Sequence, residues 1–465
     1  MAKGLPDEVQ KQIDKMTEAF RRRLTELFRW SNDEETDHPP TAVEIEDKIG
    51  EWIREIGEDT QSLVLGGMDR YRHKGKRCCP QCGEAVYWER YEPRNYITTL
   101  GEIQLERAYY HHAVCHCGWV PMDERLGIGA SELSPRVQER LSYLGAFMPF
   151  GQAQVFLARY CNIHVSHDTV NNATVAIGQA LREEQEAAVR RAWEEHQLPA
   201  CEATPPPQRL YVSADGINYL LPSGEGKEIK VAAVYETEER SNKKGEIEIH
   251  AVDIEYVVAT GGEDLARAAY LAAVKRGVES ADQIVVLGDG ANWIWNRVAV
   301  MFPEHKTTEV VDFYHASEYI WDAGKTVWGE ETEETETWSE GFCHRLKHDG
   351  SAPVLQELRA LSLAYSTIPE PVTKAITYFE NQSPRMNYPL YVEQGLQIGS
   401  GSAESGVKQV VGCRVNQAGM RWNPERAEAV AHVRAAILSD RWDEFWSDFH
   451  PPPRQYRRKG VPLTA

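Results

Sequence analysis

The sequence predicts a multidomain α/β protein, and three observations lead to this prediction. The chain has 465 residues, more than a single hydrophobic core usually serves, so we expect two to four domains. Two pairs of closely spaced cysteines flank a segment in which apolar and polar residues alternate. Two apolar runs, 209–214 and 283–288, each end in Asp-Gly and are separated by strand-like and helical segments.

The composition excludes several classes of protein. Hydrophobic residues make up 42% and charged residues 26%, which is typical of a folded chain and excludes a mostly disordered one. No apolar run reaches the roughly 18 residues that a membrane span needs, and the charged N-terminus lacks a signal-peptide apolar region. Nine cysteines, several of them crowded together, favour a reducing compartment and a metal site. We therefore expect a cytoplasmic protein with no membrane partner.

Residues 1–70 are predicted to form an N-terminal helical region. Apolar residues recur at three- and four-residue steps from Val9 to Phe28, and a second stripe runs from Val43 to Ile56. The acidic, proline-containing stretch 33–40 separates the two helices. Such helices most often serve packing or oligomerisation.

Residues 71–130 have the pattern of a zinc ribbon. The pairs Cys79/Cys82 and Cys115/Cys117 are joined by a segment with strand-like alternation, and Gly83 permits a tight knuckle after the first pair. Four thiolates would close a tetrahedral structural Zn²⁺ site. The second pair is C-x-C, closer than the usual C-x-x-C, so His116 is a substitute ligand if one cysteine is not used. The alternative is that these are buried or spare thiols.

Residues 131–203 are predicted to be a helix-turn-helix DNA-binding domain. A helix opens at Ser134-Pro135, a second follows over 150–161, and the polar turn 162–164 leads to a third. The start of that last helix would reach DNA through Ser166, His167 and Thr169. An ordinary helical bundle is the alternative interpretation. A further charged helix is expected over 180–195, before the proline-rich linker 203–208.

Residues 204–315 are predicted to be the first part of an RNase H-like core. The strands expected at 209–214, 230–236 and 249–258 are followed by a helix, the apolar strand 283–288, a helix over 292–302 and a strand over 308–311. This order makes the first and fourth strands parallel neighbours. Asp215 and Asp289 would then project side by side from matching strand ends.

A third carboxylate is expected from the end of the core. Residues 316–395 have helical patterns and form an all-helical insertion, 396–445 complete the core, and 446–465 form a basic, proline-rich tail. Glu404 begins a helix after Gly-Ser-Gly-Ser, and Lys408, Arg414 and Arg421 follow as candidate DNA contacts. Turn chemistry at Asp-Gly and a helix-dipole role for Glu404 are the structural alternatives.

Neighbouring carboxylates repel each other unless a cation lies between them. Two Mg²⁺ (or Mn²⁺) ions held by Asp215, Asp289 and Glu404 would meet this need and suit phosphodiester chemistry. One ion would activate a water and later a 3′-hydroxyl, and the other would stabilise the leaving 3′-oxygen.

Four motifs together resemble the DDE transposases of bacterial insertion sequences. They are VSADG (212–216), VVLGDGANWIW (285–295), DFYHASEY (312–319) and GSGSAESGVKQVVGCRVNQAGMRW (399–422). The likeness is to the IS-Kra type, related to Mutator-like transposases, and runs from about residue 75 to 440. The resemblance implies a catalytic triad of Asp215, Asp289 and Glu404. It also implies that Asp312 and His315 match an accessory D-x-x-H element.

The expected function is therefore Mg²⁺-dependent DNA strand cleavage and strand transfer of an insertion sequence. The partners would be transposon terminal inverted repeats, target DNA and further copies of the chain, in a dimer or higher oligomer associated with the nucleoid when bound to DNA. Two alternatives stay open: a domesticated, non-catalytic DNA-binding protein, and an RNase H-like DNA nuclease. Because the net charge is −20, attraction to DNA must come from local basic patches.

Overall fold

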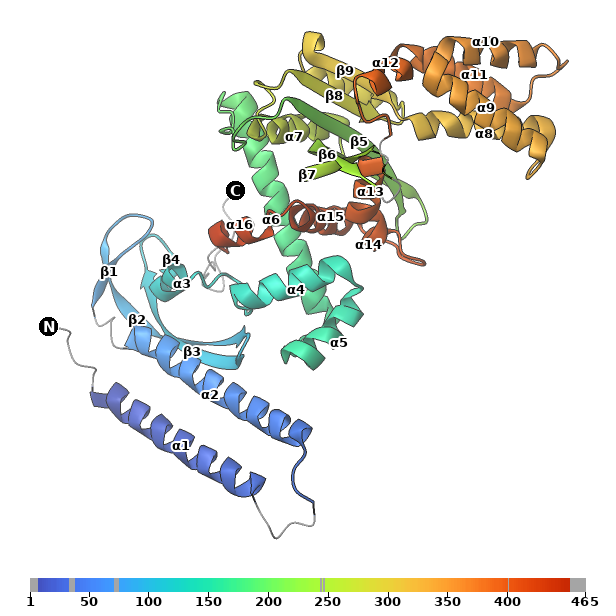
Figure 1. Cartoon of the computed structure of the whole chain (residues 1–465). Coiled ribbons are helices and arrows are strands. Elements are labelled where there is room, and N and C mark those ends of the chain that lie inside the picture. The colour runs from blue at the N-terminus through green and yellow to red at the C-terminus, as the bar shows by residue number, and fades with distance from the viewer. Residues whose placement is uncertain are drawn as a thin grey trace. The chain divides into compact units, whose positions relative to one another are not determined.

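The computed structural model is a mixed α/β protein with two sheets (Figure 1). The residues that it describes are 7–32, 38–70, 75–242, 245, 247–399 and 401–451. The chain divides into two compact units, one of residues 1–141, 150–170 and 446–465, and one of residues 142–149 and 171–445. In the described part of the chain, no helix is long and apolar enough to cross a membrane.

Two long helices open the first unit, as predicted. They are α1 (Asp7–Ser31) and α2 (Ala42–Arg70). Thr41 and Glu44 explain where α2 begins, because Glu44 accepts from the Thr41 backbone N–H at 2.7 Å while the Thr41 hydroxyl accepts from the Glu44 N–H at 3.3 Å. Within the predicted break, residues 33–37 lie outside the described residues.

A four-stranded antiparallel sheet in the order β1-β2-β3-β4 follows. Its strands are β1 (Lys76–Cys78), β2 (Ala85–Thr98), β3 (Gly101–His112) and β4 (Cys117–Trp119). Tyr96, Ile103 and Leu105 form a buried cluster at one end of the long hairpin. The short helix α3 (Pro121–Leu126) packs nearby, where Asp123 pairs with the buried Arg107 guanidinium at 2.6 Å.

Three helices come next: α4 (Pro135–Phe147), α5 (Phe150–Cys161) and α6 (His167–Glu194). Ser166 ends the turn before α6, and its hydroxyl accepts from the Thr169 N–H at 3.1 Å. The sequence predicts two helices in this segment, but α6 is one continuous helix of 28 residues. Its sequence contains no proline, and its one glycine, Gly178, lies where a Cβ would clash with the Ala429 backbone.

The second unit is built on a five-stranded sheet in the order β7-β6-β5-β8-β9. The strands are β5 (Arg209–Leu220), β6 (Gly226–Ser241), β7 (Ile247–Ala259), β8 (Gln283–Gly288) and β9 (Thr307–Val311). The first three pair antiparallel, whereas β8 pairs parallel with both β5 and β9. The predicted parallel pairing of the first and fourth strands is therefore confirmed.

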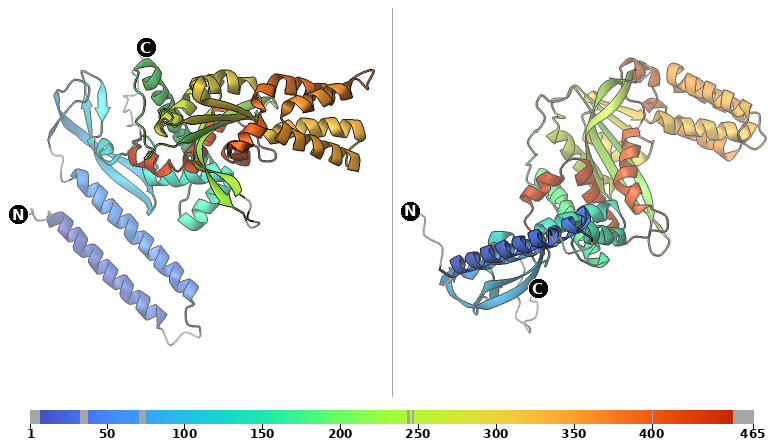
Figure 2. Two further views of the ribbon diagram at one scale, coloured as in Figure 1. Left: turned by 45° about the horizontal axis from the view of Figure 1, so that its top comes forward. Right: turned by 60° about the horizontal axis from the view of Figure 1, so that its bottom comes forward.

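Helices lie on both faces of this sheet. Helix α7 (Gly262–Lys275) lies on one face and α13 (Gly401–Val407) on the other (Figure 2). The segment predicted as a helix over 292–302 is helical, but it consists of a π-helix at Ile294–Val298 and a 3-10 helix at Ala299–Met301. After α13 come α14 (Cys413–Val415), α15 (Pro424–Leu438) and α16 (Trp442–Asp448).

The stretch between β9 and α13 is helical, as predicted. It begins at Phe313, three residues before the predicted start, because Asp312 caps its first helix. The helices are α8 (Phe313–Trp328), α9 (Glu333–Asp349), α10 (Ser351–Ser362), α11 (Glu370–Gln382) and α12 (Tyr388–Glu393).

Candidate functional site

Asp215 and Asp289 occupy matching positions relative to two adjacent parallel strands. The ladder pairs Ser213 of β5 with Leu287 of β8, and each aspartate comes two residues later in the chain. Successive residues of a strand alternate between faces, so Asp215 shares the face of Ser213. The second-unit sheet therefore brings together the two carboxylates that the sequence predicts as a pair.

The backbone around each aspartate differs from the expected strand ends in one respect. Strand β8 stops at Gly288, just before Asp289, as expected. Strand β5, however, continues through Asp215 to Leu220. It does so because it remains paired with β6, from Asp215 opposite Val231 to Leu220 opposite Gly226. Both side chains are half-buried. Asp215 Oδ1 accepts from the Gly216 N–H at 2.6 Å, and Asp289 Oδ1 accepts from the Ala291 N–H at 2.8 Å.

Asp312 and His315 follow the next strand of the sheet. Asp312 is fully buried, donates its backbone N–H to the Gly288 carbonyl at 2.8 Å, and accepts from the His315 N–H at 2.7 Å as the N-cap of α8. The Asp312 carboxylate is therefore already engaged in capping α8. The His315 ring is half-buried, with Nδ1 3.2 Å from a Glu318 carboxylate oxygen.

Aromatic and amide side chains of α8 and α11 hold the loop that carries Asp289. The Tyr378 hydroxyl donates to the Asp289 carbonyl at 2.7 Å, and the Gln382 amide donates to the Gly290 carbonyl at 2.9 Å. The Tyr319 ring stacks on that of Tyr378, with centroids 4.1 Å apart. Burial first, and then the neighbouring Tyr319, Asp289 and Asp312, raise the pKa of Tyr378. Tyr378 is therefore a neutral donor at this site.

Glu404 lies in α13, on the face of the sheet that carries Asp215, and its side chain lies outside the described residues. Gly406 of the same helix lies so close to Tyr256 that a Cβ would overlap its ring. Tyr256 pairs with Ala233, and Ala233 pairs with Ser213, so all three share the face of Asp215. The helix of Glu404 thus packs on the face of the sheet that carries Asp215.

The predicted DNA contacts differ in exposure. Lys408 and Arg421 are exposed, the latter donating to the Leu221 carbonyl at 3.4 Å. Arg414 is only 1% exposed: its Nε donates to the Gly145 carbonyl at 3.0 Å and its guanidinium lies over the Trp422 ring. Arg414 is therefore a packing residue in this structure, and its prediction as a phosphate contact needs correction. At the start of α6, Ser166 and His167 are exposed and Thr169 is half-buried.

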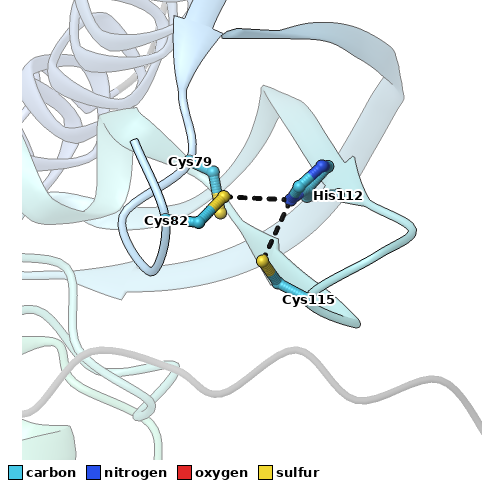
Figure 3. A group of neighbouring side chains, drawn as sticks. All are labelled: Cys79, Cys82, His112 and Cys115. Carbon is cyan, nitrogen blue, oxygen red and sulfur yellow. Dashed lines mark hydrogen bonds between the residues drawn. The ribbon is translucent and has the colours of Figure 1, made fainter. Parts of the chain in front are cut away.

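Four side chains of the first unit form a compact group with the donor atoms of a metal site. They are Cys79, Cys82, His112 and Cys115, whose ligand atoms all lie within 4.8 Å of one another (Figure 3). His112 Nδ1 lies 3.4 Å from the Cys82 sulfur and 3.1 Å from the Cys115 sulfur. Sulfur ligands of tetrahedral Zn²⁺ lie about 3.8 Å apart, given Zn–S bonds near 2.3 Å. The group could hold a metal ion.

The surroundings of the group suit a cation. Gly83 has a φ of 77°, which the knuckle after Cys82 requires, and its N–H donates to the Cys79 carbonyl at 2.9 Å. His112 directs its other nitrogen, Nε2, to a Glu84 oxygen at 3.2 Å, the outer-shell partner that metal-bound histidines usually have. The hydrogen bond to Cys82, burial and the neighbouring thiolates raise the pKa of Cys115 to about 12. A bound cation would offset the repulsion between neighbouring thiolates, and so favour the thiolate form of Cys115.

His112 is the candidate ligand that the sequence interpretation missed. Cys79, Cys82 and Cys115 were predicted, with Cys117 as fourth ligand and His116 as substitute, but the group contains neither of the last two. Cys117 lies opposite His112 in the β3–β4 ladder. A signal was present, because His112-Ala-Val-Cys115 has the two-residue gap of Cys79-Pro-Gln-Cys82.

Comparison with known proteins gives a family but no activity. Residues 42–442, which include the cysteine–histidine group and both aspartates, match UPF0236, described as an uncharacterised protein family. The chain belongs to the UPF0236 family.

Three curated UPF0236 proteins are similar to it. A UPF0236 protein in the vanSb 3′ region of Streptococcus gallolyticus is 27% identical over 168 residues, 34% of each chain. Two from Caldanaerobacter subterraneus subsp. tengcongensis are each 24% identical: one over 285 residues (60% of this chain, 54% of the relative) and one over 404 residues (84% and 77%). The chain thus spans about a third of the first relative's length and about half of the second's. The name of the second relative combines eleven locus names, and the name of the third combines four.

Proposed function

We propose that this UPF0236 protein is a DDE transposase that cleaves and joins DNA strands of an insertion sequence with the help of Mg²⁺. The observation that carries the proposal is the parallel register of β5 and β8, because Asp215 and Asp289 each come two residues after the paired Ser213 and Leu287. Neighbouring carboxylates repel each other, and divalent cations remove the repulsion.

Three further features support this proposal. The strand order β7-β6-β5-β8-β9, in which β6 alone runs antiparallel to the other four strands, is the order expected of an RNase H-like core. A helical segment intervenes between Asp289 and α13, where the resemblance leads us to expect an insertion. One protein name shared by eleven loci of a relative's genome is also what a self-copying gene would produce.

The side chains of the proposed site offer the oxygen ligands that Mg²⁺ prefers. Asp215 and Asp289 offer carboxylate oxygens, which Mg²⁺ prefers, and Glu404 would complete the set from α13. When bound, the ions would supply an activated oxygen nucleophile and stabilise negative charge on the phosphate. The chain's own part is positioning: Ala291 and Gly216 N–H groups orient the two carboxylates, and Tyr378 holds the backbone of Asp289. Lys408 and Arg421, both exposed, would contact phosphates.

Two alternative functions can be distinguished from that of a transposase by experiment. A domesticated DNA-binding protein would bind DNA without cutting it, and an RNase H-like nuclease would cut without joining. The test uses a plasmid in which the DNA that flanks this gene surrounds a resistance marker. Joining of the marker to new DNA supports the transposase, cutting without joining indicates the nuclease, and binding alone indicates the domesticated protein.

We further propose that Cys79, Cys82, His112 and Cys115 hold a structural Zn²⁺ in a zinc-ribbon-like domain. The convergence of three sulfurs and one ring nitrogen, with Glu84 behind the ring, supports this proposal. The ion would tie the knuckle of β1 and β2 to the β3–β4 turn. Ser166, His167 and Thr169 at the start of α6 remain the proposed helix-turn-helix contacts with transposon ends.

Magnesium should stabilise the wild-type chain more than Asp289→Asn. A ligand at ten times its Kd adds about 1.4 kcal/mol to the free energy of unfolding, which corresponds to roughly 3–5 °C in a unit of this size. Asn keeps the hydrogen bond from Ala291 but lacks the charge. Thermal unfolding with MgCl₂, against NaCl of equal ionic strength, measures the shift. Asp282→Asn, at the other end of β8, should behave as wild type; equal shifts in all three proteins would contradict a metal site here.

Tyr378→Phe should lower strand-cleavage activity about tenfold, since a lost buried hydrogen bond of about 1.4 kcal/mol would let the Asp289 loop move. Tyr391→Phe is the matched control, because its hydroxyl donates to the Glu309 carbonyl at 3.1 Å, within β9. Cleavage of the flanking-DNA substrate at fixed Mg²⁺ measures both. If the two variants lost activity equally, the effect would be one of stability, and the positioning role of Tyr378 would be wrong.

A further inference from the structure

The helices α1 and α2 are long but poorly buried within one chain. They span 25 and 29 residues, and no described side chain of either is fully buried. Helices in water are stabilised mainly by burial of an apolar face, because their intrinsic propensity contributes little. Leu65 of α2 packs against the core of the hairpin, but no described side chain of α1 is fully buried, so the pair has little of this stabilisation within one chain.

The contact between the two helices is loose. They lie side by side and run in opposite directions (Figure 1). The Phe20 and Trp52 rings meet at 5.0 Å, and Arg23 pairs with Glu55 at 2.7 Å. Between α1, α2 and the β2–β3 hairpin lies a cavity of about 1000 Å³. One chain alone does not fill this space.

Large apolar side chains remain exposed on both helices. Phe28 of α1 is 64% exposed, Ile53 of α2 is 58% and Val64 of α2 is 56%. Phe20 and Leu24 of α1 are exposed as well. Apolar groups repeated along two neighbouring helices form the kind of surface that marks a protein interface.

The charges of α1 and α2 indicate which partner covers their exposed apolar surface. Helix α1 has six basic and five acidic residues, with Arg21, Arg22 and Arg29 exposed in its second half. Helix α2 has three basic and eight acidic residues, with Glu46, Glu51 and Asp59 exposed. One helix is thus net positive and its neighbour strongly negative. A two-fold axis would set α1 of each chain against α2 of the other, so both complementary surfaces come from the same sequence.

We infer that a second copy of this chain docks on the α1–α2 pair, and that the two pairs form an antiparallel four-helix bundle. The bundle buries Phe28 and Ile53 in a shared core and sets the arginines of α1 against the carboxylates of α2 across the axis. This inference does not depend on the proposed catalytic function, since it concerns only the first unit. For a transposase, the same axis would hold two DNA ends together.

The mass of the full chain in solution tests the inference. Sedimentation velocity over a wide concentration range should give a dimer of about 105 kDa, twice 52.7 kDa. The double variant Phe28→Glu/Ile53→Glu should be monomeric with unchanged helix content, since both side chains are already exposed in one chain. Leu363→Glu, which alters a residue 86% exposed at the end of α10, should remain dimeric. A wild-type monomer at every concentration, or a dimer that survives the double variant, would overturn the inference.

Charge reversal tests the pairing itself. One variant changes Arg21, Arg22 and Arg29 to Glu, and the other changes Glu46, Glu51 and Asp59 to Lys. Each alone should weaken self-association at least about tenfold, because like charges then face each other in both contacts. A mixture of the two should form a heterodimer, because the acidic α1 of the first variant meets the basic α2 of the second, and the unchanged α1 meets the unchanged α2. Interactions within one chain predict no such rescue on mixing. If the mixture stays monomeric, or the face binds lipid vesicles or another protein instead, the second copy is not the occupant.

Discussion

Asp289→Asn is expected to reduce strand cleavage of the flanking DNA at least 100-fold. Outer-shell partners of metal ligands already contribute about 10–100-fold, and a ligand itself contributes more. Asparagine keeps the acceptor for the Ala291 N–H, so the loop after β8 should keep its conformation. Asp215→Asn should have the same effect, and it too keeps its bond from the Gly216 N–H. Cleavage is measured on labelled DNA at fixed protein and Mg²⁺ concentrations.

The control is Asp282→Asn, which removes an exposed carboxylate just before the start of β8. It changes the net charge by the same amount but lies at the opposite end of the strand. All three variants should bind the flanking DNA as the wild type does, because binding rests on basic groups elsewhere. Cleavage at the wild-type rate by Asp215→Asn or Asp289→Asn would exclude the two-metal proposal.

Glu404→Gln extends this experiment to the third proposed ligand. We expect a loss comparable to that of Asp289→Asn, since α13 packs on the face of the sheet that carries Asp215. If Glu404→Gln cut at the wild-type rate, the third ligand would have to be sought elsewhere. Asp312 is then the next candidate, although its carboxylate already caps α8.

Cys82→Ser is expected to reduce bound zinc from about one ion per freshly purified chain to almost none. Structural zinc contributes an apparent binding free energy of about 10–16 kcal/mol, as much as the whole stability of many domains. The loss should unfold the knuckle end of the sheet, because the residues of β1 are exposed and those of β4 are only half-buried. The other end should persist, because Tyr96, Ile103 and Leu105 are packed there. Metal analysis and hydrogen exchange measure the two effects.

Cys117→Ser and His112→Ala separate the predicted ligand set from the observed one. His112→Ala should lose zinc as Cys82→Ser does, whereas Cys117→Ser should keep it, because Cys117 lies outside the group. Cys78→Ser, next to Cys79 but exposed, is the control for loss of a thiol alone. Zinc retained in His112→Ala and lost in Cys117→Ser would restore the four-cysteine site that spacing predicts.

Spacing along the chain was enough to predict much of the local structure. The stripe from Val9 to Phe28 predicts α1, and Gly83 after Cys82 predicts the knuckle, because helix periodicity and turn conformation depend on residues a few positions apart. The continuous apolar run before Asp289 predicts the buried strand β8. Each of these signals relates residues that are only a few positions apart in the chain.

Sequence pattern could not predict which residues from distant parts of the chain contact one another. Spacing favours Cys117 as a metal ligand, yet the β3–β4 ladder brings His112 to the group. Likewise, the basic character of Arg414 favours a phosphate contact, yet packing encloses its guanidinium against Gly145 and Trp422. In both cases the sequence indicates the chemical type of the side chain. It does not indicate the neighbours of that side chain, because these come from segments that become adjacent only when the chain folds.

The sequence by itself determined the residue types of the candidate site: carboxylates after apolar strands, paired thiols around a hairpin, and a glycine-framed helix for Glu404. Only the tertiary structure decided which of them meet. The register of β5 against β8 joins residues 74 positions apart, and the bond from Tyr378 to the Asp289 backbone joins residues 89 positions apart. Such contacts depend on the burial of whole strands and helices against one another, and that energy is shared over many residues rather than recorded in any one motif.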